Sequence, residues 1–186
     1  VAQVNKHMPR TFGDCFLHVS QIDYLVEHDE LLLEWPVVDE HDETVQQIAA
    51  NVARLVADGS TLQVGIGRIP DAVLHALTEK HDLGVHTEMF SDGVMKLVLN
   101  GNITCRKKTV NPGKIVGSFA AGSQAMFDFI DNNPMIEMRP SEYTNNPMVI
   151  ARHRQLVAIN TALEVDLTGQ VCADSIGQQL YSGIGG

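Results

Sequence analysis

From Asp42 onward, short apolar stretches alternate with stretches of helical period, and this alternation restricts the chain to few folds. Strands are predicted at 61–65, 83–87, 114–119, 134–138 and 155–159, and helices at 70–79, 91–99 and 123–131. A strand, a helix and a second strand in succession form a βαβ unit, whose two strands are parallel. The sequence therefore predicts an α/β fold with an open, mostly parallel sheet flanked by helices.

An amphipathic helix is predicted ahead of the first strand, and Asp58-Gly59 ends its pattern. Its apolar residues recur at helical spacing and are expected to be buried: Val45, Ile48, Ala49, Val52, Leu55 and Val56. In the helix at 123–131, Ser123 is the expected N-cap. The expected core residues of that helix are Met126, Phe127 and Ile130.

The two ends of the chain differ from this middle part. Residues 1–38 lack a helical period, and short strands are expected between Cys15 and Val26. Glu34-Trp35-Pro36, followed by acidic residues from Glu40, is typical of a linker. We therefore expect 1–38 to be the end of a preceding α/β domain plus a linker. Residues 39–186 form a second domain, which is expected to be truncated at the glycine run 182–186.

Charge and hydropathy exclude several classes of partner. The chain has 13 Lys and Arg against 23 Asp and Glu, which disfavours nucleic acid and anionic membranes as partners. No apolar run approaches the roughly 20 residues of a membrane span, and the first residues do not resemble a signal peptide, so a cytoplasmic location is expected. Arg106-Lys107-Lys108 is the one local basic patch, and a solvated loop explains it equally well.

The cysteines and histidines give no metal-binding pattern. Cys15, Cys105 and Cys172 are widely spaced and lack a Cys-x-x-Cys companion, which is typical of reduced thiols. His81 and His86 lie across a predicted strand and not on one helix face. Neither a metal nor a permanently bound cofactor is expected.

The stretch from His86 to Gly93 places Glu88 on a predicted turn between a strand and a helix. Reactive groups of α/β enzymes lie at such turns. A second explanation is that Glu88 only interacts with the free N–H groups and the dipole of the following helix. Asp92-Gly93 is explained by helix capping or a turn. Glu164 is a rival carboxylate, on a predicted edge strand that alternates in polarity.

Gly65-Ile66-Gly67 follows a predicted strand and opens a helix, so its backbone amides could approach a ligand. A simple tight turn explains the same residues. A dinucleotide site is disfavoured, because Pro70 replaces the third glycine of the Gly-x-Gly-x-x-Gly pattern. The chain also lacks the Gly-x-Ser-x-Gly motif of serine hydrolases.

Six motifs in a fixed order resemble the acetyl-CoA hydrolase/transferase family, and within it the 4-hydroxybutyrate or butyrate type of CoA-transferase. They are Met8–Asp14, Gly65–Pro70, His86–Gly93, Tyr143–Pro147, Glu164–Val171 and Ser182–Gly186. The resemblance spans nearly the whole chain. Several unrelated motifs in one order are far more specific than any single motif.

The resemblance implies two related α/β domains and a glutamate, Glu88, that attacks an acyl-CoA thioester. It implies an amide-bearing loop at Val64, Gly65, Ile66 and Gly67, a side-chain amide donor at Asn145, and an oxyanion loop at Gly185 and Gly186. The implied substrates are acetyl-CoA, or another acyl-CoA, and a short-chain carboxylate such as 4-hydroxybutyrate or butyrate. A homodimer is also implied. The alternatives are an acetyl-CoA hydrolase and a non-catalytic module that binds CoA or a nucleotide.

Overall fold

The central part of the molecule is a strip of parallel strands. The computed structural model describes residues 1–35 and 42–183. One sheet contains β10 (Leu156–Ile159), β4 (Thr61–Val64) and β5 (Gly84–Val85), and another contains β7 (Ile115–Gly117), β9 (Ile136–Met138) and β2 (Phe12–Gly13). A parallel bridge between His86 and Val116 joins the two sheets. The strand order is therefore β10-β4-β5-β7-β9-β2, and every pairing in it is parallel.

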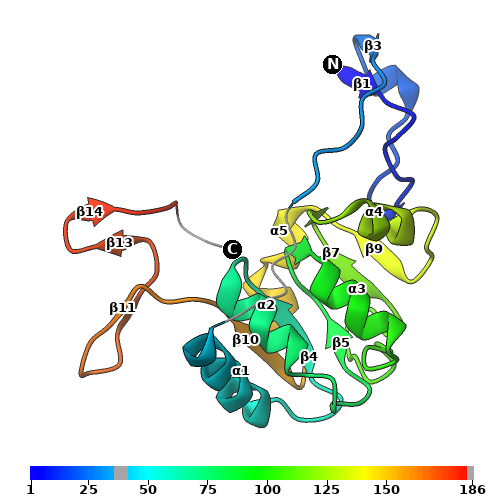
Figure 1. Ribbon diagram of the computed structural model, residues 1–186. Coiled ribbons are helices and arrows are strands. Elements are labelled where there is room, and N and C mark those ends of the chain that lie inside the picture. Colours follow the sequence, from blue (N-terminus) through cyan, green and yellow to red (C-terminus); the bar gives the residue numbers. More distant parts are fainter. Residues whose placement is uncertain (36–41, 184–186) are drawn as a thin grey trace.

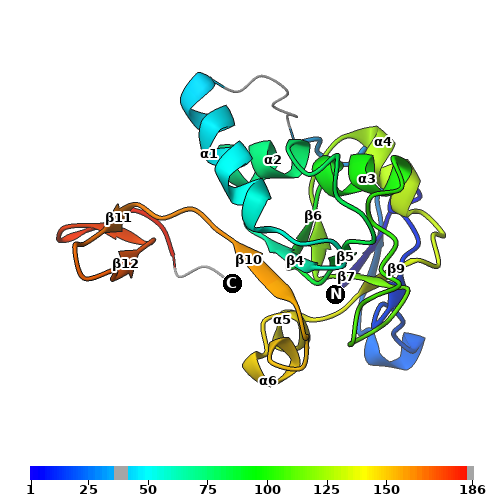
Figure 2. The same ribbon diagram turned by 90° about the horizontal axis from the view of Figure 1, so that it is seen from below.

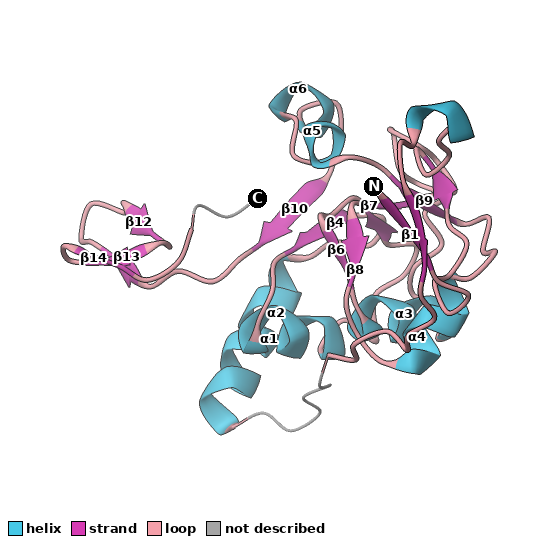
Figure 3. Ribbon diagram, turned by 90° about the horizontal axis from the view of Figure 1, so that it is seen from above, coloured by secondary structure: helices cyan, strands magenta, loops and turns pink. Residues whose placement is uncertain are grey.

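Helices cover both faces of this strip, which confirms the predicted α/β fold. Figures 2 and 3 show one helical layer on one face and two short helices on the opposite face. The larger layer contains α1 (Glu43–Leu55), α2 (Arg68–His75), α3 (Asp92–Leu99) and α4 (Gln124–Ile130). The opposite face carries α5 (Ser141–Thr144) and α6 (Pro147–Ile150). The core between the strands and the larger layer contains Leu62, Leu83, Val85, Phe90, Ile115 and Ile136.

The prediction that Ser123 is the N-cap of α4 is confirmed, but part of the predicted buried face of α1 is wrong. The Ser123 hydroxyl accepts a hydrogen bond from the Met126 N–H at the start of α4. In α1, Val45 and Ala49 are buried, whereas Ile48 is 37% and Leu55 80% exposed. The reason is that α1 packs mainly on α2, so only a narrow stripe of small side chains is covered.

Several predicted elements have different bounds in the structure. Helix α2 begins at Arg68, because the φ of 120° at Gly67 lies outside the helical region, and residues 76–79 form turns instead of helix. The strand predicted at 114–119 is divided into β7 and β8 (Phe119–Ala120). Strand β8 pairs in parallel with β6 (Met89–Phe90), an element that the sequence did not predict. The pairing of His86 with Val116 is therefore continued, in the same register, by β6 and β8.

The two ends of the chain project from the central part (Figure 1). The N-terminal segment has the parallel pair β1 (Ala2–Val4) and β3 (Leu25–Glu27) and the 3-10 helix η1 (Val19–Gln21). Within the range 15–26, where short strands were predicted, only the start of β3 is a strand. The C-terminal arm has two hairpins, β11 (Glu164–Val165) with β12 (Val171–Cys172), and β13 (Ser175–Ile176) with β14 (Gln179–Leu180). The predicted domain boundary at 38/39 lies outside the described residues.

Candidate active site

Glu88 lies between the bridge at His86 and strand β6, so a short strand separates it from helix α3. Its carbonyl oxygen accepts two hydrogen bonds, from the Ser118 N–H at 2.7 Å and the Phe119 N–H at 3.1 Å. These bonds hold the main chain of Glu88 at the point where β7 gives way to β8. Among the described residues the Glu88 carboxylate makes no hydrogen bond with the N–H groups of α3. The side chain is half-buried, its main chain is held in place, and within residues 1–35 and 42–183 its carboxylate has no hydrogen-bond or ion-pair partner.

The Glu88 side chain and the glycine turn line the same cavity. This cavity has a volume of about 890 Å³. Its walls include Glu88, Met89 and the whole turn from Val64 to Gly67, together with Asn160, Leu163 and Tyr181. The structure thus brings together the acidic residue and the amide-bearing turn that the sequence singled out separately.

The four amides of this turn are not equivalent. The Val64 N–H donates to the Thr87 hydroxyl at 3.0 Å, and the Gly65 N–H donates to the Ile159 carbonyl at 2.8 Å. Neither amide is available to a ligand in this conformation. The described residues provide no hydrogen-bond partner for the N–H groups of Ile66 and Gly67. These two amides, at the start of α2, are the ones that can face an anionic ligand.

Two side chains of neighbouring strands determine the shape of the turn. The Gln63 and Asn160 amides pair reciprocally, with N···O distances of 3.2 and 2.7 Å, and connect the ends of β4 and β10. A Cβ atom at Gly65 would lie 2.6 Å from the Asn160 side-chain oxygen. A side chain at position 65 would therefore displace the Asn160 amide from its pairing with Gln63.

The remaining predicted site residues lie elsewhere. Asn145 follows α5, is half-buried, and does not line the cavity that contains Glu88. Glu164, the rival carboxylate, lies exposed on the first hairpin of the C-terminal arm. Gly185 and Gly186 lie outside the described residues.

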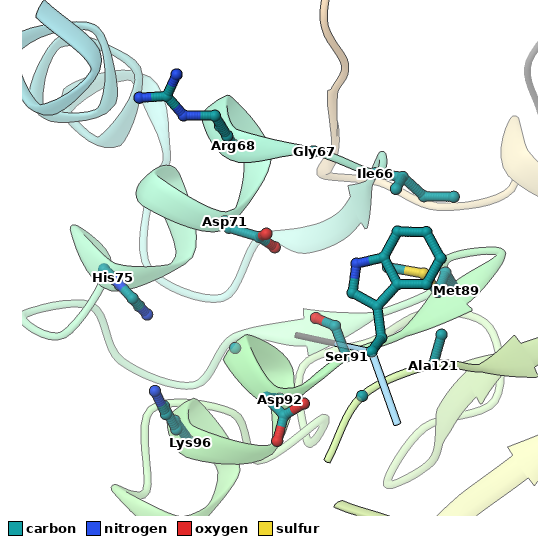
Figure 4. Close-up of a pocket in the computed structure, with 13 residues that line it drawn as sticks. Ile66, Gly67, Arg68, Asp71, His75, Met89, Ser91, Asp92, Lys96 and Ala121 are labelled. Atoms are coloured by element: carbon teal, nitrogen blue, oxygen red, sulfur yellow. The ribbon is translucent and has the colours of Figure 1, made fainter. Parts of the chain in front are cut away.

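A second pocket, of about 170 Å³, borders the same turn and shares Ile66, Gly67, Arg68 and Met89 with the larger cavity. Figure 4 shows Ser91 and Asp92 of the α3 start beside it. The Asp92 carboxylate accepts hydrogen bonds from the Ser123 N–H, at 2.9 Å, and from the Ser123 hydroxyl. Asp92 therefore connects the start of α3 to the N-cap of α4. Ser91 is the N-cap of α3, so Asp92 supports the start of α4 instead of capping its own helix.

A buried lysine was missed by the sequence analysis. Lys108 is 5% exposed, and its ammonium group donates to the carbonyls of Val85 and Lys114, both at 2.6 Å. Burial lowers the pKa of Lys108 to about 8. Lys107 forms an ion pair with Asp82 at 3.3 Å. For Lys108 both sequence interpretations, a ligand-binding patch and a solvated loop, are wrong, because its ammonium group lies inside the fold.

Two buried histidines lie beside this lysine. His86 donates from Nε2 to the Thr144 carbonyl at 3.0 Å, and its ring centroid lies 4.8 Å from that of His153. Burial lowers the pKa of both imidazoles, that of His153 to about 4, and the nearby charges of His86 and Lys108 contribute to the shift of His153. Both rings are therefore neutral near pH 7. The sequence signal that could have revealed a buried histidine here is an apolar strand that ends in histidine, as at 83–86.

The described ranges contain no group of three or more His, Cys, Asp or Glu side chains that could hold a metal ion. In the same ranges no helix is both long enough and apolar enough to cross a bilayer.

Comparison with known proteins gives consistent matches. The family model for the acetyl-CoA hydrolase/transferase C-terminal domain matches residues 122–186. A 4-hydroxybutyrate coenzyme A transferase of Clostridium kluyveri is 52% identical over 100% of this chain and 43% of its own length. A succinyl-CoA:acetate/propanoyl-CoA:succinate CoA transferase of Fasciola hepatica is 50% identical over 100% of this chain and 39% of its own length.

A solved structure agrees with these matches. The crystal structure of a 4-hydroxybutyrate CoA-transferase from Porphyromonas gingivalis superposes with a TM-score of 0.85 at 47% identity, covering 91% of this chain and 43% of that one. The chain spans about two fifths of the length of these relatives. The motifs, the parallel sheet and these matches agree, and the chain belongs to the acetyl-CoA hydrolase/transferase family.

Proposed function

We propose that this chain carries the nucleophilic part of a CoA-transferase that moves CoA between an acyl-CoA and a short-chain carboxylate. One observation supports this most directly: the Glu88 carboxylate and the unengaged amides of Ile66 and Gly67 share one cavity. A carboxylate beside preorganised N–H donors can attack a carbonyl carbon while the donors stabilise the oxyanion that forms. The names of the relatives support the same reaction class.

The proposed reaction passes through two covalent states of Glu88. A carboxylate oxygen attacks the thioester carbonyl, the C–S bond breaks, and a mixed acyl-glutamyl anhydride and CoA thiolate result. The thiolate then attacks the glutamyl carbonyl, the acyl group leaves as its carboxylate, and a glutamyl-CoA thioester remains. The acceptor carboxylate reverses these steps, so ping-pong kinetics are expected.

Each step passes through a tetrahedral oxyanion that needs hydrogen-bond donors. The proposed donors are the amides of Ile66 and Gly67, the side-chain amide of Asn145, and the loop at Gly185 and Gly186. One such donor is typically worth about 3 kcal/mol of transition-state stabilisation. CoA is a substrate in this scheme and not a bound cofactor.

The choice of acceptor acid and the competing reaction with water are two further parts of this proposal. Acetyl-CoA or another acyl-CoA is the proposed donor, with 4-hydroxybutyrate or butyrate as the acceptor. One methylene changes binding by only about 1–3 kcal/mol, so related acids must be compared directly. The matched family also includes hydrolases, and an acetyl-CoA hydrolase would result if water reached the glutamyl intermediates. The homodimer and the cytoplasmic location remain predictions.

Covalent trapping in the full-length gene product tests this proposal. The protein is incubated with acetyl-CoA, treated with borohydride, which reduces a glutamyl thioester to an alcohol, and mapped by peptide mass spectrometry. Reduction at Glu88 in the wild type, and none in Glu88→Gln, is the expected result. Glu164→Gln is the matched control, since Glu164 is an exposed carboxylate on the C-terminal arm.

Other outcomes would contradict the proposal. Turnover without an adduct, or an adduct at Glu164 or a cysteine, would rule out Glu88 as the nucleophile. Binding of CoA without exchange would favour the non-catalytic module. Release of free CoA without transfer to any acid, with the Glu88 adduct present, would favour the hydrolase.

A further inference from the structure

Ser118 contacts the Glu88 segment on one side and α5 on the other. Its N–H donates to the Glu88 carbonyl at 2.7 Å. Its hydroxyl lies 2.6 Å from the Thr144 hydroxyl. One residue, at the join of β7 and β8, thus contacts both the segment of the proposed nucleophile and the helix that precedes Asn145.

Thr144 is held through its main chain as well as its side chain. It is 2% exposed, and its carbonyl accepts the hydrogen bond from His86 Nε2 at 3.0 Å. His86 directly follows β5 and Ser118 directly follows β7, the two strands that the bridge between His86 and Val116 joins. The last turn of α5 is therefore attached to both strands that end at the Glu88 segment.

Either oxygen can donate in the Ser118–Thr144 hydroxyl pair, and a second contact of Thr144 bears on which one does. The Thr144 hydroxyl donates to the Asn145 side-chain oxygen over a longer distance, 3.4 Å. A threonine hydroxyl has one proton, so when it donates to Asn145 it must accept from the Ser118 hydroxyl. The two hydroxyl groups together therefore hydrogen-bond to the side-chain oxygen of Asn145, which is the acceptor end of its amide. The NH₂ group, the end that can stabilise an oxyanion, makes no hydrogen bond within the part of the chain that the structure describes.

We infer that Ser118 and Thr144 are positioning residues that hold the Asn145 amide in a fixed orientation relative to Glu88. The inference rests on the proposed function, in which Glu88 is the nucleophile and Asn145 a donor. Neither hydroxyl touches the reacting atoms in this scheme. They act on the rate by limiting the rotation of the Asn145 amide about its side-chain bonds. This limit matters because displacement of a reactive group by about 1 Å can reduce a rate a hundredfold.

The test is a double-mutant cycle on exchange activity in the full-length gene product. Thr144→Val removes the hydroxyl and keeps the shape of the side chain. It is expected to lower kcat about tenfold to a hundredfold, with the KM for acyl-CoA within about twofold of the wild type. In an Asn145→Ala background the same substitution is expected to lower kcat by less than about twofold, because the amide that it orients is gone.

Three further variants separate positioning from general stability. Thr144→Ser keeps the hydroxyl and is expected to restore most of the rate. Ser118→Ala keeps the N–H bond to Glu88, is less buried, and is expected to reproduce the kcat loss if Thr144→Val folds poorly. Thr104→Val removes a hydroxyl that donates to Asp82 at 2.9 Å, outside the site, and is the control that keeps the wild-type kcat.

The outcomes distinguish this inference from the proposed function. Wild-type kcat in both Thr144→Val and Ser118→Ala, with the Glu88 adduct still trapped, would overturn the positioning role alone. A kcat loss that is fully retained in the Asn145→Ala background would also overturn it. Absence of the Glu88 adduct in the wild type would instead overturn the proposed function on which the inference rests.

Discussion

The Thr87 hydroxyl engages both main-chain polar groups of Val64, accepting from its N–H at 3.0 Å and donating to its C=O at 2.9 Å. The backbone ladder between β4 and β5 has ended by this point, with the His86 N–H donating to the Leu62 carbonyl as the last bond. A side chain therefore continues the connection between the two strands. The strand end that leads into Glu88 is fixed against the glycine turn by this one buried residue.

Thr87→Val should destabilise the fold. The change keeps the size of the side chain but leaves the N–H and C=O of Val64 without a partner. A buried unpaired group costs about 1–3 kcal/mol, so a loss on the order of 2 kcal/mol in the free energy of unfolding is expected from urea titration. Thr87→Ser retains the hydroxyl and should remain within about 1 kcal/mol of the wild type. Equal stability of Thr87→Val and the wild type would contradict this role.

Gly67→Ala should reduce both stability and exchange activity. A Cβ atom at this position meets no atom within 4 Å, but its φ of 120° is a conformation that other residues rarely adopt. The strain is expected to cost about 1–3 kcal/mol and to move the amides at the start of α2. Gly113→Ala is the matched control, with a φ of 75° and open space around it, outside the cavity. Both variants should lose stability in thermal unfolding, and Gly67→Ala alone should lose kcat.

Substitutions of the two polar site residues should have unequal effects. Glu88→Gln should abolish exchange, because a neutral amide does not form the anhydride. Asn145→Ala should reduce kcat about a hundredfold, since one oxyanion donor is worth about 3 kcal/mol. Steady-state assays of acyl exchange measure both changes. Wild-type rates in either variant would contradict the role assigned to that residue.

His153 should make the fold sensitive to mild acid. Its folded pKa is about 4, below the ordinary value of 6.5, so its neutral form is the one that the fold accommodates. Its contribution to stability is complete above pH 6.5 and is lost as the pH falls from 6.5 towards 4. Each pKa unit corresponds to about 1.4 kcal/mol, which gives a loss on the order of 3 kcal/mol across this range.

His153→Phe isolates this effect. Neither ring nitrogen of His153 has a hydrogen-bond partner among the described residues, so a Phe ring replaces it without breaking a bond. Urea titrations at pH 7 and pH 4 should show the variant gaining stability relative to the wild type as the pH falls. His86 and Lys108 are present in both proteins, so their titration cancels in the comparison apart from their electrostatic coupling to His153. A constant difference between the two pH values would contradict the prediction.

The repeating parts of the fold could be predicted from the sequence, and their exact limits could not. Alternating apolar runs predicted the parallel sheet, and Ser123 predicted the start of α4. Strand β6 was missed because two residues, Met89 and Phe90, are too short for a period to show. Ile48 and Leu55 match a helical period, but which part of an apolar stripe is covered depends on the neighbouring helix.

The sequence singled out Glu88 and the glycine turn, which line one cavity, but it did not show how they are connected, and Asn145 does not line that cavity. The motif around Glu88 and the glycines at 65 and 67 were visible as local patterns. The occupied amide of Val64 was not, because its partner Thr87 is distant in the sequence. The burial of Lys108 could not be predicted, because its sequence neighbours Arg106 and Lys107 suggested a surface loop. Its two carbonyl partners are supplied by tertiary structure.

The pairing of β2 with β9 has a consequence for the handling of this protein. Phe12 and Gly13 form the outermost strand of the strip, and the Asp14 N–H adds a further bond to the Met138 carbonyl at 2.9 Å. A chain cut at the predicted linker would lose this strand and leave the backbone groups of β9 open along one side. Open edges of this kind recruit strands from other molecules, and the result is aggregation. Strand β2 therefore covers the edge of β9 and protects the sheet from self-association, although the sequence pattern assigned these residues to a different domain.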